Sequence, residues 1–336
     1  MKAFITADFD EYGLELLKKH MEYEFENWRD TKKIYFDENE FINKIKSVGA
    51  DVVIVEADFV MKNVIAQCDL KIIASCRDDP WNVDIKTATE KGIPVFSAPH
   101  RNTPSVADLT VGLMLCVARN IMKADRLLRA GKIIYKSEMD FLENFNLFKG
   151  IELGGKKVGI IGLGSIGFQV AKRLRNGFGS EILVYDPYVN EDRLKEVDGK
   201  SVDLETLMRE SDIVTVHARV TDETKGMIKK KHFEMMKETA YFINTARAAI
   251  TEEDALFEVL RNKKIAGAGL DVFIKDPIES GDRFLTLDNV IATPHIGGNT
   301  IDTVRHQSKM IAEDIDSYLT GKEPKYILNK EVLKKT

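Results

Sequence analysis

The chain has 336 residues, of which 44% are apolar and 31% are charged, and its net charge is −5. This length allows two domains of ordinary size, each with its own core, and the composition is typical of a soluble globular protein. Lysine and arginine are spread along the chain without a basic block, which argues against nucleic-acid binding. No apolar run is long enough to span a bilayer, which argues against a membrane protein.

The cysteines and the N-terminus indicate a reducing compartment. Cys68, Cys76 and Cys116 form an odd set without the spacing of a disulfide framework or a metal site. Cys68 and Cys116 lie in apolar helical patterns, which are typical of reduced core residues. The first ten residues lack the apolar core of a signal peptide. We therefore expect a cytoplasmic protein without a metal site.

Residues 1–98 alternate between short apolar runs and amphipathic segments, a pattern that predicts a parallel sheet covered by helices. The expected strands are 2–6, 23–28, 51–55, 71–75 and 94–96, and the expected helices are 12–20, 40–47, 60–67 and 84–91. Ligands of such sheets bind beyond the carboxyl ends of the strands. The polar residues there are candidates for substrate contacts, although solvated turns explain them equally well: Glu56, Arg77, Asp78, Asp79 and Trp81.

Residues 99–150 connect this unit to the next and contain long helical patterns. The segment 106–119 is apolar on most of its surface, so it belongs either in a core or in a subunit interface. We expect the interface, with the segment buried across a twofold axis. A second helical pattern, 121–130, carries basic residues.

Residues 158–186 carry the strongest motif of the chain. A buried-strand pattern precedes Gly162, Gly164 and Gly167 at the spacing G-x-G-x-x-G, and an amphipathic helix and a second strand follow. Asp186 ends that strand 19 residues after the last glycine, close to the spacing of about 20 in dinucleotide-binding proteins. The glycines permit a tight turn and a close approach to a pyrophosphate, which would face the helix N-terminus. Asp186 would bond the adenosine ribose and repel a 2′-phosphate, which favours NAD over NADP.

Four further strands complete a predicted six-stranded sheet, at 213–216, 240–245, 266–270 and 290–293, and a long helix follows at 301–319. Each strand ends at a glycine or a polar residue. These ends line a single crevice, made of the glycine loop with Asp186, His217, Arg247, Asp271 and His295.

The polar residues of this crevice suit the reduction of a 2-keto acid. Arg247 is permanently charged and offers a planar fork of donors for a carboxylate and a ketone oxygen. His295 is suited to donate a proton to the alkoxide that forms near neutral pH. Asp276 lies five residues after Asp271, and a carboxylate bonded to the other imidazole nitrogen would orient the ring and favour its charged form. Taken singly, each of these residues also fits a structural salt bridge or cap.

The sequence resembles the D-isomer-specific 2-hydroxyacid dehydrogenases, the family that contains D-lactate and D-3-phosphoglycerate dehydrogenases. The resemblance rests on LKIIASC, NVDIKTATEKGIPV, SVADLTVGLMLCVARN, GKKVGIIGLGSIG, FINTARAA, AGLDVF and NVIATPHIGGNT. It implies NAD as cofactor, catalysis by Arg247, Asp276 and His295, and a homodimer formed through the cofactor domain.

The resemblance also implies an α/β fold with two doubly wound parallel-sheet domains. A Rossmann dinucleotide-binding domain of residues 99–299 would be inserted in a flavodoxin-like substrate domain made of residues 1–98 and 300–336. Asp271 would contact the nicotinamide end, and His217 would form a wall of the same pocket. The full set expected to bind NAD is Gly162, Gly164, Ser165, Ile166, Gly167, Asp186, His217, Ala218, Thr245, Ala246, Arg247, Asp271, His295 and Gly297.

Three departures from the family pattern limit what can be transferred. The acid paired with the histidine is usually Glu, and here it is Asp276, which must either lie closer or bond through a water. Ala248 stands where glycine usually follows the arginine, and residues 77–84 replace a glycine-rich substrate loop. The charges of that loop favour a hydroxylated 2-hydroxy acid, with Arg77 a candidate for holding a phosphate. Two other functions remain open: an NAD-sensing binding protein of the corepressor type, and a formate- or phosphite-type dehydrogenase.

Overall fold

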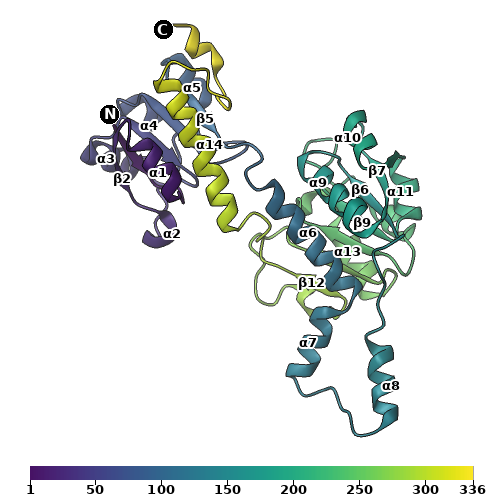
Figure 1. The fold of residues 1–336 in the computed structure, drawn as a ribbon. Coiled ribbons are helices and arrows are strands. Elements are labelled where there is room, and N and C mark those ends of the chain that lie inside the picture. Colours follow the sequence, from purple (N-terminus) through teal and green to yellow (C-terminus); the bar gives the residue numbers. More distant parts are fainter. Residues whose placement is uncertain (336) are drawn as a thin grey trace. The chain divides into compact units, whose positions relative to one another are not determined.

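The computed structural model describes residues 1–335, which form two compact units (Figure 1). Unit 1 contains residues 1–102 and the chain from Thr300 onward, and unit 2 contains residues 103–299. The predicted division at residue 98 lies four residues before the boundary in the structure. Each unit is a parallel sheet covered by helices, so the fold is the predicted pair of α/β domains.

Unit 1 is built on a five-stranded parallel sheet of order β2-β1-β3-β4-β5. This is the flavodoxin-like order, in which the order of successive parallel strands reverses between β1 and β3. The strands are β1 (Lys2–Ile5), β2 (Glu22–Phe25), β3 (Val52–Val55), β4 (Ile72–Ser75) and β5 (Val95–Ser97). The helices are α1 (Glu11–Leu17), α2 (Trp28–Thr31), α3 (Glu38–Val48), α4 (Lys62–Gln67), α5 (Ile85–Glu90), α14 (Ile301–Leu319) and the short 3₁₀ helix η4 (Lys330–Lys335).

The strands of unit 1 are apolar on both faces because helices cover both. Successive side chains of a strand point to opposite faces. Phe4 and Val53 therefore pack toward α3, α4 and α5, while Ile5 and Ile54 pack toward α1 and α14. The C-terminal helix α14 thus belongs to the core of unit 1, although some 200 residues of unit 2 precede it in the chain.

Unit 2 contains a seven-stranded parallel sheet of order β12-β11-β10-β9-β6-β7-β8. Its strands are β6 (Lys157–Ile161), β7 (Glu181–Tyr185), β8 (Gly199–Ser201), β9 (Ile213–Val216), β10 (Tyr241–Asn244), β11 (Gly267–Leu270) and β12 (Val290–Ala292). The order from β8 to β11 is that of the dinucleotide-binding fold, whose crevice opens between β6 and β9. The predicted count of six strands is wrong by one, because the three-residue edge strand β8 has a polar sequence without a strand pattern.

Helices cover both faces of this sheet. They are α6 (Thr103–Ala118), α7 (Ile121–Arg129), α8 (Glu138–Leu147), α9 (Ser165–Arg173), α10 (Glu191–Glu196), α11 (Leu204–Glu210), α12 (Lys230–Glu234) and α13 (Glu253–Arg261). A π-helical turn, η1 (Leu174–Phe178), ends α9, and two 3₁₀ turns, η2 (Ala248–Ile250) and η3 (Arg283–Thr286), lie in loops after β10 and β11. One core cluster lies under α6 and α9, and the other lies under α11, α12 and α13.

The apolar helix α6 is a core helix of unit 2. Ten of its sixteen residues are buried, and its side chains pack beside α9 and over β10 and β11. Burial within one chain therefore explains the apolar sequence that we expected in a subunit interface. Many of the exposed apolar side chains of unit 2 lie instead on α7, α8 and the loop between them, which project as an arm from unit 2 (Figure 1).

Candidate functional site

The glycine loop between β6 and α9 has the geometry that a bound dinucleotide needs. Gly162 has φ +92°, and a Cβ there would lie 2.9 Å from the Ala218 nitrogen. A Cβ at Gly167 would lie 2.0 Å from the carbonyl oxygen of Gly162, so both positions exclude side chains. A Cβ at Gly164 would meet nothing within 4 Å, which leaves open space beside the loop. Helix α9 begins at Ser165 and Ile166, and its N-terminal N–H groups can bind a pyrophosphate at this opening.

Asp186 lies at the carboxyl end of β7 and holds the glycine loop. Its Oδ2 accepts a hydrogen bond from the Leu163 nitrogen at 2.8 Å, and its Oδ1 accepts one from the Tyr188 nitrogen at 2.9 Å. Each carboxylate oxygen can accept a further bond. The residue is half-buried, so the carboxylate is both ordered and available to a ribose hydroxyl.

His217 follows β9 and lies against the same loop. Its Cβ would contact a Cβ at Gly167 at 3.3 Å, and its Nε2 lies 3.0 Å from the Thr215 hydroxyl oxygen. Its Nδ1 is buried and has no hydrogen-bond partner among the side chains and backbone of residues 1–335. Burial lowers the pKa of the His217 imidazole to about 3, so the ring is neutral at physiological pH. His217 therefore supports the loop as a neutral side chain and is not a second acid.

Asn244 orders the turn that carries Arg247, a role that the sequence analysis missed. Asn244 is the last residue of β10 and is 2% exposed. Its Oδ1 accepts a bond from the Ala246 nitrogen, and its Nδ2 donates to the Arg247 carbonyl. Buried Thr245 lies 2.8 Å from the Thr110 hydroxyl of α6. The guanidinium of Arg247 is exposed beyond these groups, and within residues 1–335 its hydrogen bond is to the Ala246 carbonyl, 2.7 Å away.

Asp271 anchors the loop that carries His295. Its Oδ1 accepts bonds from the Thr293 hydroxyl at 2.6 Å and the Ile296 nitrogen at 2.9 Å, and its Oδ2 accepts one from the Gly297 nitrogen at 2.9 Å. The residue is 1% exposed. A Cβ at Gly297 would lie 3.0 Å from Oδ2, so a side chain there would push against the carboxylate. The structure thus gives Asp271 a positioning role, while its expected contact with the nicotinamide stays a prediction.

His295 and Asp276 contact each other directly. The Nδ1 of His295 bonds the Oδ2 of Asp276, and the two side chains are 40% and 31% exposed. His295 has φ +55°, a conformation that turns the chain sharply after β12. Of the two arrangements expected for the shorter acid, the structure has the direct contact and needs no bridging water. Nε2 of the imidazole is left for a ligand.

The five expected substrate residues all lie in unit 1, and one of them, Glu56, is buried in an ion pair. Glu56 is 9% exposed and pairs with Arg101, whose Nη1 lies 2.9 Å from Oε1, while the Trp28 Nε1 donates to Oε2. Gln307 of α14 also contacts this pair. The carboxylate is therefore enclosed and paired, and a substrate contact of Glu56 stays a prediction that this geometry does not favour. Its partners lie 28 to 251 residues away in sequence and carry no common motif.

The remaining substrate candidates lie in the loop after β4. The Arg77 Nη1 donates to the Glu56 carbonyl at 3.0 Å, and its guanidinium carbon lies 4.9 Å from the centre of the Trp81 ring. Trp81, Asp78 and Asp79 are exposed. This loop thus presents a charged and aromatic surface at the carboxyl edge of the sheet.

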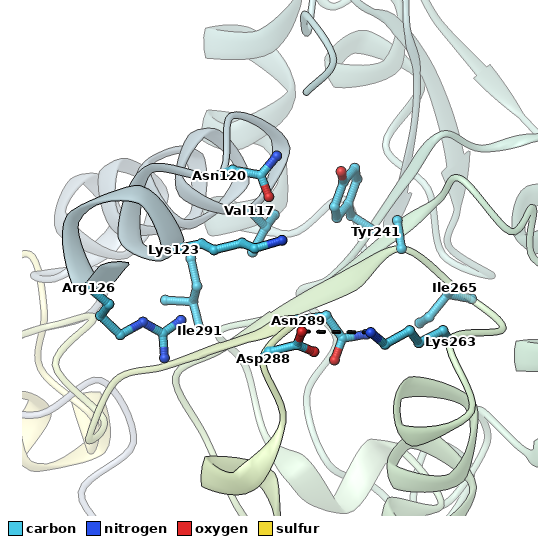
Figure 2. A pocket seen from close by; sticks show the side chains of 11 residues that line it. Val117, Asn120, Lys123, Arg126, Tyr241, Lys263, Ile265, Asp288, Asn289 and Ile291 are labelled. Carbon is cyan, nitrogen blue, oxygen red and sulfur yellow. Dashed lines mark ion pairs between the residues drawn. The ribbon is translucent and has the colours of Figure 1, made fainter. Parts of the chain in front are cut away.

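A cavity of about 280 Å³ lies at the opposite, amino edge of the sheet in unit 2, where Tyr241 begins β10 (Figure 2). Its other lining includes Lys123 and Arg126 of α7, and the 3.6 Å ion pair between Lys263 and Asp288. None of the predicted site residues lines it. Within residues 1–335 no group of His, Cys, Asp and Glu side chains could hold a metal ion.

Helix length and hydropathy give no single membrane span in the part of the chain that the structure describes. Helices α6 and α7 satisfy both criteria only as a pair, and they are bent by 63° at their junction.

Comparisons with known proteins identify the family. Residues 111–297 match the model of the D-isomer specific 2-hydroxyacid dehydrogenase NAD binding domain. The chain is 37% identical over 333 residues to a glyoxylate reductase of Thermococcus litoralis, covering 99% of this chain and 98% of the relative. It is also 37% identical to a D-3-phosphoglycerate dehydrogenase of Archaeoglobus fulgidus, covering 96% of this chain and 58% of that longer protein.

A solved structure agrees with this family. The apo-structure of D-lactate dehydrogenase from Escherichia coli superposes with a TM-score of 0.76 at 25% identity, covering 98% of this chain and all of the other. The glycine loop, the open space at Gly164 and the carboxylate of Asp186 are the features that this cofactor domain requires. The chain therefore belongs to the D-isomer specific 2-hydroxyacid dehydrogenase family, and it is an NAD-linked oxidoreductase.

Proposed function

We propose that this enzyme interconverts a 2-keto acid and the corresponding D-2-hydroxy acid, with Arg247, His295 and Asp276 as its catalytic residues. The observation that carries the proposal is the His295–Asp276 contact at the carboxyl edge of the unit 2 sheet. Arg247 follows β10 at the same edge of the same sheet. Bound NADH supplies the hydride that is added to C2 of the keto acid.

Arg247 binds and orients the substrate. Its guanidinium is exposed and makes no ion pair with any side chain of residues 1–335 that the structure describes. A planar fork of donors suits a carboxylate, and one of its N–H groups can also polarise the ketone oxygen. This arrangement stabilises the negative charge that develops on the oxygen during reduction.

His295 moves the proton. Because Nδ1 faces Asp276, Nε2 is the nitrogen that donates to the ketone oxygen as it becomes a hydroxyl. Reduction consumes one hydride and this proton, and it leaves a neutral imidazole. In oxidation, the same nitrogen accepts the hydroxyl proton. The carboxylate of Asp276 fixes the orientation of the ring.

We propose a hydroxylated 2-hydroxy acid as substrate class, supported by the loop after β4. Arg77, Asp78 and Asp79 offer donors and acceptors for hydroxyl groups, and Arg77 is a candidate partner of a terminal phosphate. Glu56 is left out of this set because Arg101 neutralises it. A higher kcat/KM for pyruvate or a branched keto acid than for every hydroxylated substrate would contradict the substrate class alone.

The decisive assay measures NADH oxidation with a panel of 2-keto acids, for the wild type and for His295→Gln. General acid catalysis is worth about 10²–10⁴-fold, so His295→Gln should lose activity by a factor in that range while still binding NADH. His20→Gln is the matched control, because His20 also pairs with an aspartate, Asp316 at 2.7 Å, but lies at the amino edge of the unit 1 sheet. Tight NADH binding without turnover of any keto acid would favour an NAD-sensing protein instead.

A further inference from the structure

Two opposite charges hold the same residue of the glycine loop. The Asp186 carboxylate bonds the Leu163 nitrogen at 2.8 Å, and the Arg193 Nη1 donates to the Leu163 carbonyl oxygen at 3.3 Å. Asp186 ends β7 and Arg193 lies on α10, the next helix of the chain. Backbone bond lengths then limit the distance between the carboxylate and the guanidinium to about 10 Å. Asp186 occupies the position that bonds the adenosine ribose in dinucleotide-binding folds, and the Arg193 guanidinium lies within that distance of it.

The positive charge of Arg193 has no acidic partner in the part of the chain that the structure describes. Besides the Leu163 carbonyl, its guanidinium contacts the face of the Phe168 ring, with 5.5 Å between the guanidinium carbon and the ring centre. No ion pair to Arg193 occurs within residues 1–335. Neighbouring arginines of the same unit differ in this respect: Arg175 pairs with Asp198 and Arg173 pairs with Asp108. Arg193 is half-buried and held from two sides, so its orientation is ordered without an anion.

We infer that Arg193 is a binding residue for the 2′-phosphate of NADP(H), and that this enzyme binds NADP(H) as a second cofactor besides NAD(H). The inference rests on the cofactor assigned to this domain and not on the identity of the keto acid. An arginine near the ribose is the usual means of accommodating a 2′-phosphate. It offers up to two charge-assisted hydrogen bonds to the phosphate oxygens.

The two charges together set the preference between the cofactors. Asp186 accepts hydrogen bonds from the ribose hydroxyls of NAD(H) and repels a 2′-phosphate. Arg193 attracts that phosphate from the other side of Leu163 and offsets part of the repulsion. The expected outcome is preferential binding of NAD(H) with measurable, salt-sensitive binding of NADP(H), because a partly exposed charge pair weakens as ionic strength rises.

Equilibrium binding of two adenosine fragments tests this directly. Isothermal titration calorimetry compares 2′,5′-ADP, which carries the 2′-phosphate, with 5′-AMP, which lacks it. The proteins are the wild type, Arg193→Gln, Arg193→Lys and the control Arg175→Gln. The quantity of interest is the ratio of the affinity for 2′,5′-ADP to the affinity for 5′-AMP. Arg193→Gln should lower this ratio about tenfold. Arg193→Lys should lower it less, and Arg175→Gln should leave it at the value of the wild type.

NADPH and NADH titrations followed by nicotinamide fluorescence provide the second readout, and neither readout needs turnover. A wild type that binds 5′-AMP but no 2′,5′-ADP would overturn the inference. If Arg193→Gln bound both fragments more weakly by the same factor, the inference would also be overturned, because the arginine would then only support the loop. An enzyme that reduces no keto acid but shows the expected fragment ratio would contradict the proposed function and leave this inference intact.

Discussion

Asp271→Asn should weaken both the fold of unit 2 and the catalytic rate, because one buried carboxylate orders the loop that carries His295. The carboxylate accepts three hydrogen bonds, from Thr293, Ile296 and Gly297, at 1% exposure. An asparagine amide is isosteric but has a single acceptor oxygen. If this oxygen takes the place of Oδ1, the amide NH₂ faces the Gly297 N–H, and two donors oppose each other.

The size of the effect follows from these contacts. An unsatisfied buried donor costs about 1–3 kcal/mol, and the other two bonds weaken when their acceptor loses its charge. We therefore expect a loss of about 3 kcal/mol in the free energy of unfolding of unit 2. For a unit of this size, that loss corresponds to a fall of roughly 6–12 °C in Tm. A displacement of the His295 loop by about 1 Å would lower kcat by about 10²-fold.

Calorimetric melting and steady-state NADH oxidation measure the two effects on the same preparation. Thr293→Val is the control, since it removes one of the three bonds and keeps the carboxylate. Its loss in stability should be about 1 kcal/mol. An Asp271→Asn enzyme with the Tm and kcat of the wild type would refute the positioning role of this residue.

Three further predictions concern the cofactor, the stability and the assembly. Asp186→Ser should bring kcat/KM for NADPH closer to that for NADH, because it removes the repulsion of the 2′-phosphate; equal values in the wild type would contradict the role of Asp186. His217 has a pKa of about 3 in the fold and near 6.5 when unfolded, so the unfolded state gains its proton first and stability is lost as pH falls from about 6.5 toward 3. Urea unfolding measures the loss in the free energy of unfolding between pH 7 and pH 5. This loss should be smaller in His217→Gln than in the wild type by up to about 2 kcal/mol, and an unchanged pH dependence would contradict the neutral imidazole. A homodimer is expected through the arm of α7 and α8, because apolar side chains are exposed there, including Phe141, Phe145 and Leu128. Light scattering of the wild type should give the mass of a dimer. A monomer mass at micromolar concentration would exclude the dimer.

The features predicted from sequence are those with local causes. The glycine loop, the acid at the end of β7 and the apolar strands depend on spacings within about 30 residues, and each lies where the pattern placed it. The polar residues at the ends of β10, β11 and β12 were found because parallel strands bring their carboxyl ends to one edge.

The features that were missed depend on contacts between distant parts of the chain. Arg101, which follows β5, pairs with Glu56, which follows β3, and Gln307 contacts the same pair from α14. The apolar sequence of α6 predicts a buried helix, but it is the same whether the helix is covered by its own chain or by a partner subunit. The sequence therefore could not distinguish a core helix from an interface helix. Asp271 was identified as a strand-end acid, but its three donors lie 22 to 26 residues later in a loop with no pattern of its own.

The rate of keto-acid reduction by Asp276→Asn tests the catalytic assignment most directly. Reduction requires a proton from Nε2 of His295, whose Nδ1 bonds Asp276. The substitution removes the charge that faces Nδ1 but keeps the size of the side chain. We predict that Asp276→Asn reduces keto acids more slowly than the wild type at pH 7.5 while it still binds NADH. An unchanged rate would show that Asp276 is not the acid that acts with His295.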